Sequence, residues 1–427
     1  MSCRRAHWVP DDTGFPPHSE IEGETDMTMV EIPAAPSSAL DPFGDEVLED
    51  PYPGHRELRE AGALVWLERY RVWALARHEH VEWALRDPVT FCSERGVGLT
   101  DFAREKPWRP PSLLIEADPP EHTRARRAIT AVLSPKVVKA MRETFEREAS
   151  VMVDLLVARR TFDGVADLAV AFPVKVMPDQ IGLPVEGREN LLPYGSMVFN
   201  GFGPRNHHFD AAMAKGEAVR DRIMSCTRRE ALADGGLGVG IHEAAEAAGF
   251  SEPERELLVR SVLSAGIDTT VHAIGNALLC FVQHPEQWAI LHANPGLARA
   301  AFEEVVRFES PVQTFFRTTT REVQIEDVTI PEGEKVLLFL AAANRDRRSW
   351  GDDAERFDIE RSATGHVGFG AGIHACVGQM IARLEGEVVL RALAERVRRI
   401  ELAGEPRRQL NNTLRGLHAL PLRVQAA

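Results

Sequence analysis

Hydrophobic and polar positions change their period along this chain, and the change predicts where strands give way to helices. Residues 63–68 (ALVWLE) and 71–76 (RVWALA) have the aromatic, branched and apolar content of short strands, and the helical pattern HVEWAL follows them. From Asp118 to about Ile290 helical periods dominate. The pattern therefore predicts a mainly helical protein with a smaller β-containing part near its N-terminus.

Two of the expected helix starts carry capping signals. Asp118 and Ser251 are each followed by proline in the opening helical turn and by an acidic residue three positions on, which is typical of a helix N-terminus. A third start is expected at Glu186. We therefore expect helices to begin at these three positions.

The longest expected helix runs from Glu254 to about Gln283. This stretch contains no proline and ends before His284-Pro285, where the residue preceding proline disfavours helix. A helix of this length can cross the whole molecule. Beyond it we expect a helix around Leu297 to Phe308, short strands near Val323 to Ile330 and Lys335 to Leu340, and a closing helix after Cys376.

Residues 1 to about 40 differ in composition from the rest of the chain. They are rich in proline, serine and acidic residues with little apolar period, so we expect a mobile tail that includes the alternative start positions Met27 and Met29. Residues 41–427 show neither an internal repeat nor a low-complexity linker. The sequence therefore predicts one folded domain over residues 41–427.

Composition narrows the classes of partner. Apolar residues make up 44% and charged residues 27% of the chain, as in an ordinary globular protein. The net charge of −14 argues against nucleic-acid binding, which needs a positive surface. We see no run of about 18 consecutive apolar residues and no secretory signal, so no membrane span is expected. The five scattered cysteines suit a reducing compartment, and we expect a cytoplasmic protein.

The strongest local signal is the decapeptide Phe369–Gly378 (FGAGIHACVG), in which glycines flank Cys376 at the start of a helix. A helix N-terminus favours a negative thiolate, and glycines allow close approach to a cofactor. A buried structural cysteine is the plainest alternative. The segment Gly370–Ala375 also satisfies the dinucleotide pattern G-x-G-x-x-A, although we see neither the preceding strand nor the later acidic residue that this motif needs.

The decapeptide resembles the haem-binding signature of the cytochrome P450 family, Phe-Gly-x-Gly-x-His-x-Cys-x-Gly, at every specified position. The resemblance extends from about residue 41 to the end. It implies the cytochrome P450 fold, which is mainly α (α+β) with a large helical lobe and a small β-rich lobe around haem b. It also implies that Cys376 is the axial ligand of the iron and that the protein is a monooxygenase.

Further motifs appear in the order that the family has. Glu304-x-x-Arg307 resembles the E-x-x-R helix, whose ion pair engages an arginine, here Arg361, beneath the haem. Residues 265–270 (AGIDTT) resemble the oxygen-activation segment, which implies that Thr269 holds a water near dioxygen and that Asp268 relays protons. The resemblance implies that the haem propionates bind four cationic or polar side chains: His122, Arg126, Arg317 and His374.

The resemblance is closer to a bacterial subfamily that oxidises para-substituted benzoic acids. The matching segments are residues 108–112, 198–202, 260–261 and 311–317. The subfamily implies that the substrate carboxylate binds Arg109, Ser112, Arg260 and Ser261, and that the substrate ring contacts Phe199, Phe202, Ala265, Val312 and Phe315. Helix geometry agrees in part, because a rise of about 10.5 Å separates Ser261 from Asp268 on one helix face.

The implied reaction is O-demethylation or hydroxylation at the para position of a benzoate such as 4-methoxybenzoate. It uses O2 and electrons from a [2Fe–2S] ferredoxin and its NAD(P)H-dependent reductase, which could meet Arg124, Arg127 and Arg383. Alternatives remain open: another small aromatic or apolar substrate, a non-catalytic haem protein that binds a ligand, or a nicotinamide-dependent dehydrogenase. One departure is Arg347, which follows Asn344-Arg345-Asp346 where many relatives carry proline.

Overall fold

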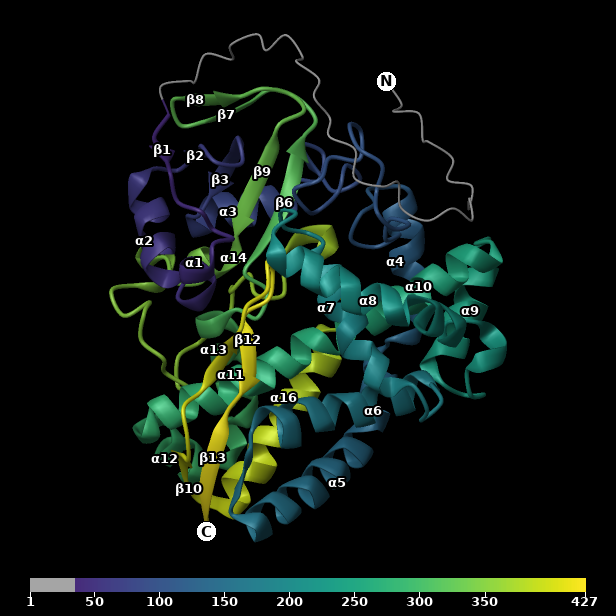
Figure 1. The fold of residues 1–427 in the computed structure, drawn as a ribbon, viewed down its shortest axis with the longest axis vertical. Helices are drawn as coiled ribbons and strands as arrows, with labels where there is room; N and C mark the ends of the chain where they lie inside the picture. The colour runs from purple at the N-terminus through teal and green to yellow at the C-terminus, as the bar shows by residue number, and fades with distance from the viewer. Residues whose placement is uncertain (1–34) are drawn as a thin grey trace.

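The computed structural model describes residues 35–427, which form a large helical lobe and a smaller β-rich lobe (Figure 1). The mainly helical fold expected from the sequence is confirmed. Most of the tail expected for residues 1 to about 40 lies outside the described residues. Within its last part, Ser37–Ser38 forms strand β1, which pairs in parallel with β2.

A six-stranded sheet organises the β-rich lobe, in the order β1-β2-β3-β9-β6-β4. Strand β9 is buried along its whole length, which explains its continuous apolar sequence. It pairs in parallel with β3 and antiparallel with β6, so it joins the two halves of the chain. The strands are β2 (Val65–Leu67), β3 (Val72–Leu75), β4 (Phe91–Cys92), β6 (Thr314–Thr319) and β9 (Lys335–Phe339).

The remaining strands form three small sheets. The expected strands near Val323 and Ile330 are confirmed as the hairpin β7 (Val323–Ile325) and β8 (Val328–Ile330). No strands were predicted after the closing helix, but four strands, β10 to β13, follow it in the structure. These sheets contain β5 (Thr161–Asp163), β10 (Val397–Leu402), β11 (Arg407–Gln409), β12 (Gly416–Ala419) and β13 (Pro421–Ala426).

Helices build the larger lobe and cover the sheet. Those of the first half are α1 (Asp45–Glu49), α2 (Tyr52–Ala61), α3 (His78–Arg86), α4 (Glu121–Val132), α5 (Pro135–Arg159), α6 (Ala171–Ile181), α7 (Leu191–Asn200), α8 (His207–Cys226) and α9 (Leu237–Ala247). Those of the second half are α10 (Glu252–Gly266), α11 (Asp268–Gln283), α12 (Pro285–Ala293), α13 (Ala298–Glu309), α14 (Leu340–Ala343), α15 (Arg347–Trp350) and α16 (Gln379–Arg396).

The long central helix is interrupted, unlike the single helix that we expected. It begins as expected, with Ser251 and Glu254 forming a capping box. At Ile267 the backbone departs to φ −102° and ψ −61°, which separates α10 from α11. The Thr269 hydroxyl donates to the carbonyl oxygen of Ala265 at 2.8 Å, and side-chain bonds of this kind compete with the helix's own hydrogen bonds. The break therefore lies within the predicted oxygen-activation segment.

The interrupted helix is also the part of residues 35–427 that is long and apolar enough to span a bilayer. It runs from Glu252 to Gln283, and 78% of its most apolar window is buried inside the protein. Helix α11 packs against α13, α16 and β12. Burial in the protein core accounts for its apolar sequence.

Two of the predicted helix starts are wrong. Asp118 is not a cap, because α4 begins at Glu121, and the Asp118 carboxylate instead accepts from the backbone N–H groups of Ser93 and Glu94 at 2.8 and 2.9 Å. After Glu186 a short 3-10 turn comes first, and α7 begins only at Leu191. Long-range contacts therefore replaced the expected local cap.

Arg347 is accommodated without strain. It is the first residue of α15, and the Asp346 side chain caps that helix by accepting from Arg348 N at 3.1 Å. Proline is also favoured at the first position of a helix. An arginine at this position therefore keeps the same path for the chain.

Candidate active site

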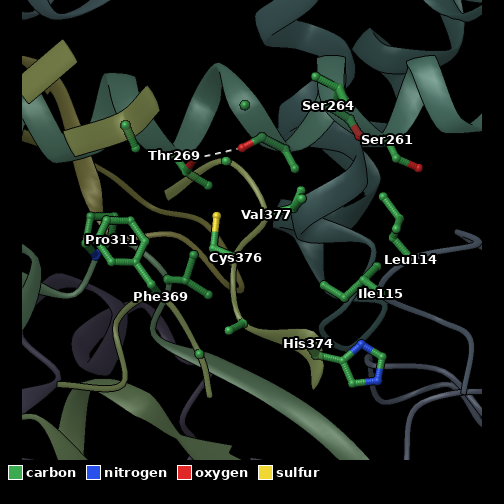
Figure 2. Close-up of a pocket in the computed structure, with 18 of the residues that line it drawn as sticks. Leu114, Ile115, Ser261, Ser264, Thr269, Pro311, Phe369, His374, Cys376 and Val377 are labelled. Carbon is green, nitrogen blue, oxygen red and sulfur yellow. Dashed lines mark hydrogen bonds between the residues drawn. The ribbon is translucent and has the colours of Figure 1, made fainter. Parts of the chain in front are cut away.

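A single cavity between the α10–α11 helix and the Cys376 loop gathers nearly all the predicted site residues (Figure 2). Asp268 is the exception and does not line it. The predicted residues that line the cavity are Arg109, Ser112, His122, Arg126, Phe199, Phe202, Arg260, Ser261, Ala265, Thr269, Val312, Phe315, Arg317, His374 and Cys376.

Cys376 lies just before α16, and Figure 2 shows its sulfur directed toward the helix that carries Thr269. Burial raises the pKa of the thiol, while the backbone N–H groups of Gly378 and Gln379 favour the thiolate. Gly372 has φ +65°, and a Cβ there would lie 2.6 Å from the carbonyl oxygen of Leu85. The absence of a side chain at Gly372 thus allows the loop to pack closely against α3. This packing helps to fix the position of Cys376.

The loop does not have the surroundings of a dinucleotide site. Between β9 and Gly372 the described chain contains only the short helices α14 and α15, so no strand leads into the glycines. The sheet also mixes parallel and antiparallel pairs. The dehydrogenase alternative lacks the strand–turn–helix unit that its motif requires.

Thr269 and Asp268 occupy different environments although they are neighbours. Thr269 lines the cavity and donates its hydroxyl hydrogen to Ala265 O. The Asp268 carboxyl is buried against α7, where a Cβ on Gly195 would meet it at 2.5 Å. Burial raises the pKa of Asp268 well above its usual range, which favours the protonated carboxyl.

One end of the cavity holds a cluster of two arginines and two histidines: Arg126, Arg317, His122 and His374. The rings of His122 and His374 lie 4.4 Å apart, and Asp118 accepts from His374 Nε2 at 3.4 Å. Arg126 donates to Ala375 O at 2.5 Å. Burial lowers the pKa of Arg317 to about 10 and, with the nearby cations, that of His122 to about 4. The Nδ1 atom of His122 is buried and has no hydrogen-bond partner among the residues that the structure describes.

Another part of the cavity holds two further buried arginines. The Arg109 guanidinium pairs with Glu116 at 2.9 Å, and Arg260 donates to Pro110 O at 3.0 Å. Burial and the charge of Arg109 lower the pKa of Arg260 to about 10, so it stays charged at pH 7. One carboxylate therefore faces two guanidinium groups, and the buried Arg109 Nε atom finds no hydrogen-bond partner in the described part of the chain.

Hydroxyl groups and aromatic rings complete this part of the cavity. The hydroxyl oxygens of Ser112 and Ser261 lie 3.2 Å apart, which links the loop before α4 to α10. Phe202 meets Phe199 and Phe315 edge to face, with ring centroids 5.9 and 5.8 Å away. This wall presents apolar edges and faces suited to a small ring.

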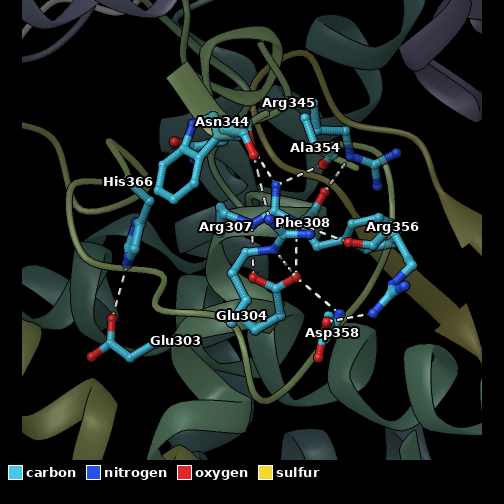
Figure 3. Close-up of polar contacts among 12 residues, drawn as sticks. Glu303, Glu304, Arg307, Phe308, Asn344, Arg345, Ala354, Arg356, Asp358 and His366 are labelled. Carbon is cyan, nitrogen blue, oxygen red and sulfur yellow. Dashed lines mark hydrogen bonds and ion pairs between the residues drawn. The ribbon is translucent and has the colours of Figure 1, made fainter. Parts of the chain in front are cut away.

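Glu304 and Arg307 form a fully buried ion pair outside the cavity (Figure 3). Arg307 donates from Nε and Nη2 to Glu304, each at 2.7 Å, and to three backbone carbonyl oxygens, those of Asn344, Ala354 and Arg356. The expected third member, Arg361, lies 3.5 Å from Glu304 and pairs more closely with Asp353. The network thus fastens α13 to the irregular chain before the cysteine loop.

Comparison with known proteins agrees with this geometry. Residues 237–423 match the family described as "Cytochrome P450". The chain is 53% identical over 393 residues to cytochrome p450 CYP199A2 of Rhodopseudomonas palustris, covering 92% of this chain and 95% of that protein. This chain belongs to the cytochrome P450 family. It is therefore a cytochrome P450 monooxygenase with haem b as its cofactor.

Solved structures of other cytochromes P450 share the fold. Cytochrome P450 CYP109Q5 from Chondromyces apiculatus is 32% identical, with a TM-score of 0.76 over 91% of this chain and 98% of that one. Cytochrome P450 CREJ in complex with (4-ethylphenyl) dihydrogen phosphate is 25% identical, with a TM-score of 0.80 over 90% and 99% of the two chains.

The cavity of this cytochrome P450 suits haem b in charge and in space. Arg126 and Arg317 offer the charges and the histidines the ring N–H donors that two propionate carboxylates need, and His122 Nδ1 has no other partner within residues 35–427. A Cβ at Gly266 would meet nothing within 4 Å, so the helix leaves room beside the cavity. These features belong to this chain and agree with the cofactor of its family.

Sequence reasoning missed two acidic residues at the site of this cytochrome P450. Glu116 fixes Arg109 and accepts from Ser112 N at 2.7 Å, and its four-residue spacing from Ser112 was the available signal. Glu385 lines the cavity from α16, hydrogen-bonds Thr270, and has a pKa raised well above its usual range by burial. An acid on the apolar face of the closing helix could have marked it.

Proposed function

We propose that this cytochrome P450 oxidises para-substituted benzoic acids, such as 4-methoxybenzoate, by O-demethylation or hydroxylation. The observation that carries the proposal is the pair of buried arginines facing one carboxylate, Glu116, inside an otherwise apolar cavity. An unbalanced buried charge is costly unless a partner arrives. A monoanionic ligand supplies that partner.

In this proposal Cys376 ligates the haem iron through its thiolate, with the backbone N–H groups of Gly378 and Gln379 directed at the sulfur. Haem b bound by a thiolate supplies the reductive activation of dioxygen. The propionates are held by His122, Arg126, Arg317 and His374. Arg126 and Arg317 contribute positive charge and the two histidines contribute ring N–H donors, which together favour carboxylate partners over water.

The substrate carboxylate is placed against Arg109 and Arg260, beside the paired hydroxyl groups of Ser112 and Ser261. Phe199, Phe202 and Phe315 then wall the ring, and Val312 and Ala265 line its path toward Thr269. This orientation directs the para substituent away from the arginines. The position opposite the carboxylate is therefore the one that is oxidised.

Thr269 and Asp268 are proposed to take part in proton delivery to the cavity. The Thr269 hydroxyl gives its hydrogen to Ala265 O, so its lone pairs can hold a water molecule in the cavity. Burial favours the protonated form of Asp268, which can donate a proton. Its carboxyl faces Gly195, so delivery requires the side chain to swing toward the cavity.

The electron donors are proposed to be a [2Fe–2S] ferredoxin and its NAD(P)H-dependent reductase. Of the three arginines expected to meet the ferredoxin, Arg127 is exposed and Arg124 is partly exposed beside Phe250. Arg383 is engaged in an ion pair with Glu303, so it is the weakest of the three candidates. A docking face would rest mainly on α4.

A solved relative gives the proposal chemical support. Cytochrome P450 CREJ was solved with (4-ethylphenyl) dihydrogen phosphate, an aromatic ring with an anionic group at one end and a para alkyl group at the other. A para-substituted benzoate has the same arrangement of charge, ring and oxidisable group. The shared arrangement supports an anionic aromatic substrate for this chain.

The test compares an acid with its neutral analogue. 4-Methoxybenzoate should shift the haem to high spin in a spectral titration, while 4-methoxybenzamide should bind much more weakly. Arg260→Ala should weaken acid binding by about ten- to a hundredfold, since a charge-assisted hydrogen bond contributes roughly 1.5–3 kcal/mol. Its effect on the amide should be far smaller.

This design separates lost recognition from damage to the cavity. Equal losses for acid and amide in Arg260→Ala would contradict carboxylate anchoring. Tight binding of the amide to the unaltered protein would also contradict it. The family assignment would stand in both cases.

A further inference from the structure

Two adjacent histidines and an aspartate meet on the surface, away from the haem cavity. Asp45 begins α1, and His207 and His208 begin α8. The Asp45 Oδ1 atom lies 3.4 Å from His207 Nε2 and 2.9 Å from His208 Nε2. The side chains of Asp45 and His207 are 58% and 67% exposed, so solvent can reach the group, whereas His208 is 13% exposed.

The backbone around the cluster is firmly placed. Asn206 caps α8 by accepting from Phe209 N at 3.1 Å, and its amide nitrogen donates to Asn412 at 2.8 Å and to Phe43 O at 3.4 Å. Phe43 lies just before Asp45 in the chain. The same cap therefore fixes both segments that carry the cluster, and it orients two consecutive histidines toward one carboxylate.

The spacing of the three side chains matches the needs of a metal ion. The ligand atoms of Asp45, His207 and His208 all lie within 4.8 Å of one another. Zinc binds histidine nitrogen and carboxylate oxygen at about 2.0–2.2 Å in tetrahedral geometry, which places neighbouring ligands roughly 3.3–3.6 Å apart. The distance from Asp45 to His207, 3.4 Å, falls in this range, and the distance from Asp45 to His208, 2.9 Å, is that of a hydrogen bond, which a small shift of the exposed carboxylate would lengthen.

We propose that Asp45, His207 and His208 form a binding site for a divalent transition metal ion such as zinc. Imidazole nitrogen with one carboxylate favours such ions over calcium or magnesium, which prefer oxygen ligands. Three protein ligands leave a fourth position for water. The site is separate from the haem chemistry, and nothing in it depends on the substrate.

Metal binding at this site would restrain one part of the haem cavity lining. Metal would tether the start of α8 to α1, which are separated by more than 150 residues in the chain. Directly before α8 lies Phe202, which lines the cavity and whose carbonyl oxygen accepts from Leu99 N at 2.8 Å. A bound ion would therefore resist movement of the segment that carries Phe202.

The test is a zinc titration of the untagged, full-length holoprotein by calorimetry. His207→Ala removes one ligand from an exposed position and should not disturb folding, and Asp45→Asn removes the charge. His418→Ala replaces an exposed histidine on β12 and serves as the matched control. Zinc should bind the unaltered protein and the control alike, and at least about tenfold more weakly in the two cluster variants.

Thermal unfolding supplies a second measurement. Zinc should raise the unfolding temperature of the unaltered protein and of His418→Ala, and this rise should be lost in His207→Ala and Asp45→Asn. Equal zinc binding in all four proteins would overturn the proposal, since the ion would then lie elsewhere. Absence of zinc binding to the unaltered protein would also overturn the proposal. The three side chains would then be only a hydrogen-bonded group on the surface.

Discussion

This protein contains two groups of buried arginine side chains, and the two groups differ in how fully their positive charges are balanced. The Arg307 guanidinium has no solvent exposure, and each of its five N–H donors finds an acceptor: two from Glu304 and three from backbone carbonyls. Arg109 and Arg260 are nearly as buried but share one carboxylate, Glu116, and within residues 35–427 the Arg109 Nε atom has no hydrogen-bond partner.

The difference separates a structural site from a binding site. Burying a charge costs several kcal/mol unless hydrogen bonds and a counter-charge offset it. Around Arg307 the protein supplies both, so the group fastens the fold and has no donor left for a ligand. Around Arg260 the protein leaves a positive charge inside the cavity. That charge favours an anionic ligand over a neutral one of the same shape.

The largest effect is expected from breaking the complete group. Arg307→Ala removes both arginine hydrogen bonds from the buried Glu304 carboxylate, which keeps only the more distant Arg361 at 3.5 Å, and frees three backbone carbonyls, so we expect a loss of about 3–5 kcal/mol in unfolding free energy, or no folded holoprotein. Urea unfolding and haem content measure it. Arg229→Ala, which breaks an exposed ion pair with Asp234, should cost less than about 1 kcal/mol.

The incomplete group provides the matched comparison. Arg260→Met removes a similarly buried guanidinium but leaves no paired carboxylate behind, because Glu116 still binds Arg109. Its ligand-free stability should therefore stay close to that of the unaltered protein. A loss as large as that of Arg307→Ala would show that the two groups do not differ in the way described.

A smaller effect should follow from changing the counter-charge in the cavity. Glu116→Gln keeps the side chain's shape and an oxygen that can accept from Ser112 N, but it removes the negative charge that competes with a substrate carboxylate. Like charges about 10 Å apart, at an effective dielectric constant of about 20, repel by roughly 1.5 kcal/mol. The ratio of acid to amide affinity should therefore rise about tenfold.

Spectral titration with 4-methoxybenzoate and 4-methoxybenzamide measures this ratio. Glu105→Gln, which removes an exposed carboxylate paired with Arg205, is the control and should leave it unchanged. A ratio that falls in Glu116→Gln would mean that the carboxylate mainly positions Arg109. The charge-balance account of the cavity would then be wrong.

The two groups also differ in how far they could be predicted. The residues around Arg307 and Cys376 fall in short motifs whose spacing is set by one helix or one loop, so the sequence located them. The cavity arginines were expected only through resemblance, since nothing local distinguishes a buried Arg260 from a surface one. Glu116 escaped notice because its role depends on an irregular loop folding back on itself.

Other errors have the same origin. Asp118 has the local pattern of a helix cap, but the backbone of Ser93 and Glu94 takes its carboxylate. The long apolar helix was predicted as one piece because periodicity does not register the hydroxyl bonds that accompany its break at Ile267. Asp268 was correctly placed on this helix, yet its direction toward Gly195 depends on how α7 packs.

The smallest effect expected here concerns a buried group that can lose its charge. His55 is buried beside Phe339, and burial, followed by the nearby Arg59, Arg345 and Arg415, lowers its pKa to about 3.

Because the folded-state pKa of His55 lies below the unfolded value of about 6.5, the unfolded chain binds the extra proton. The stability that His55 contributes is present above pH 6.5 and is lost as pH falls toward 3. By pH 5.5 the loss should be about 1 kcal/mol. His55→Leu should remove this part of the pH dependence in urea unfolding, and the exposed control His418→Ala should not. An unchanged acid slope in His55→Leu would show that His55 is not held neutral. A histidine can thus meet burial by staying neutral, whereas the arginines of the cavity remain charged at pH 7, so their charge has to be balanced by a carboxylate of the protein or of a ligand.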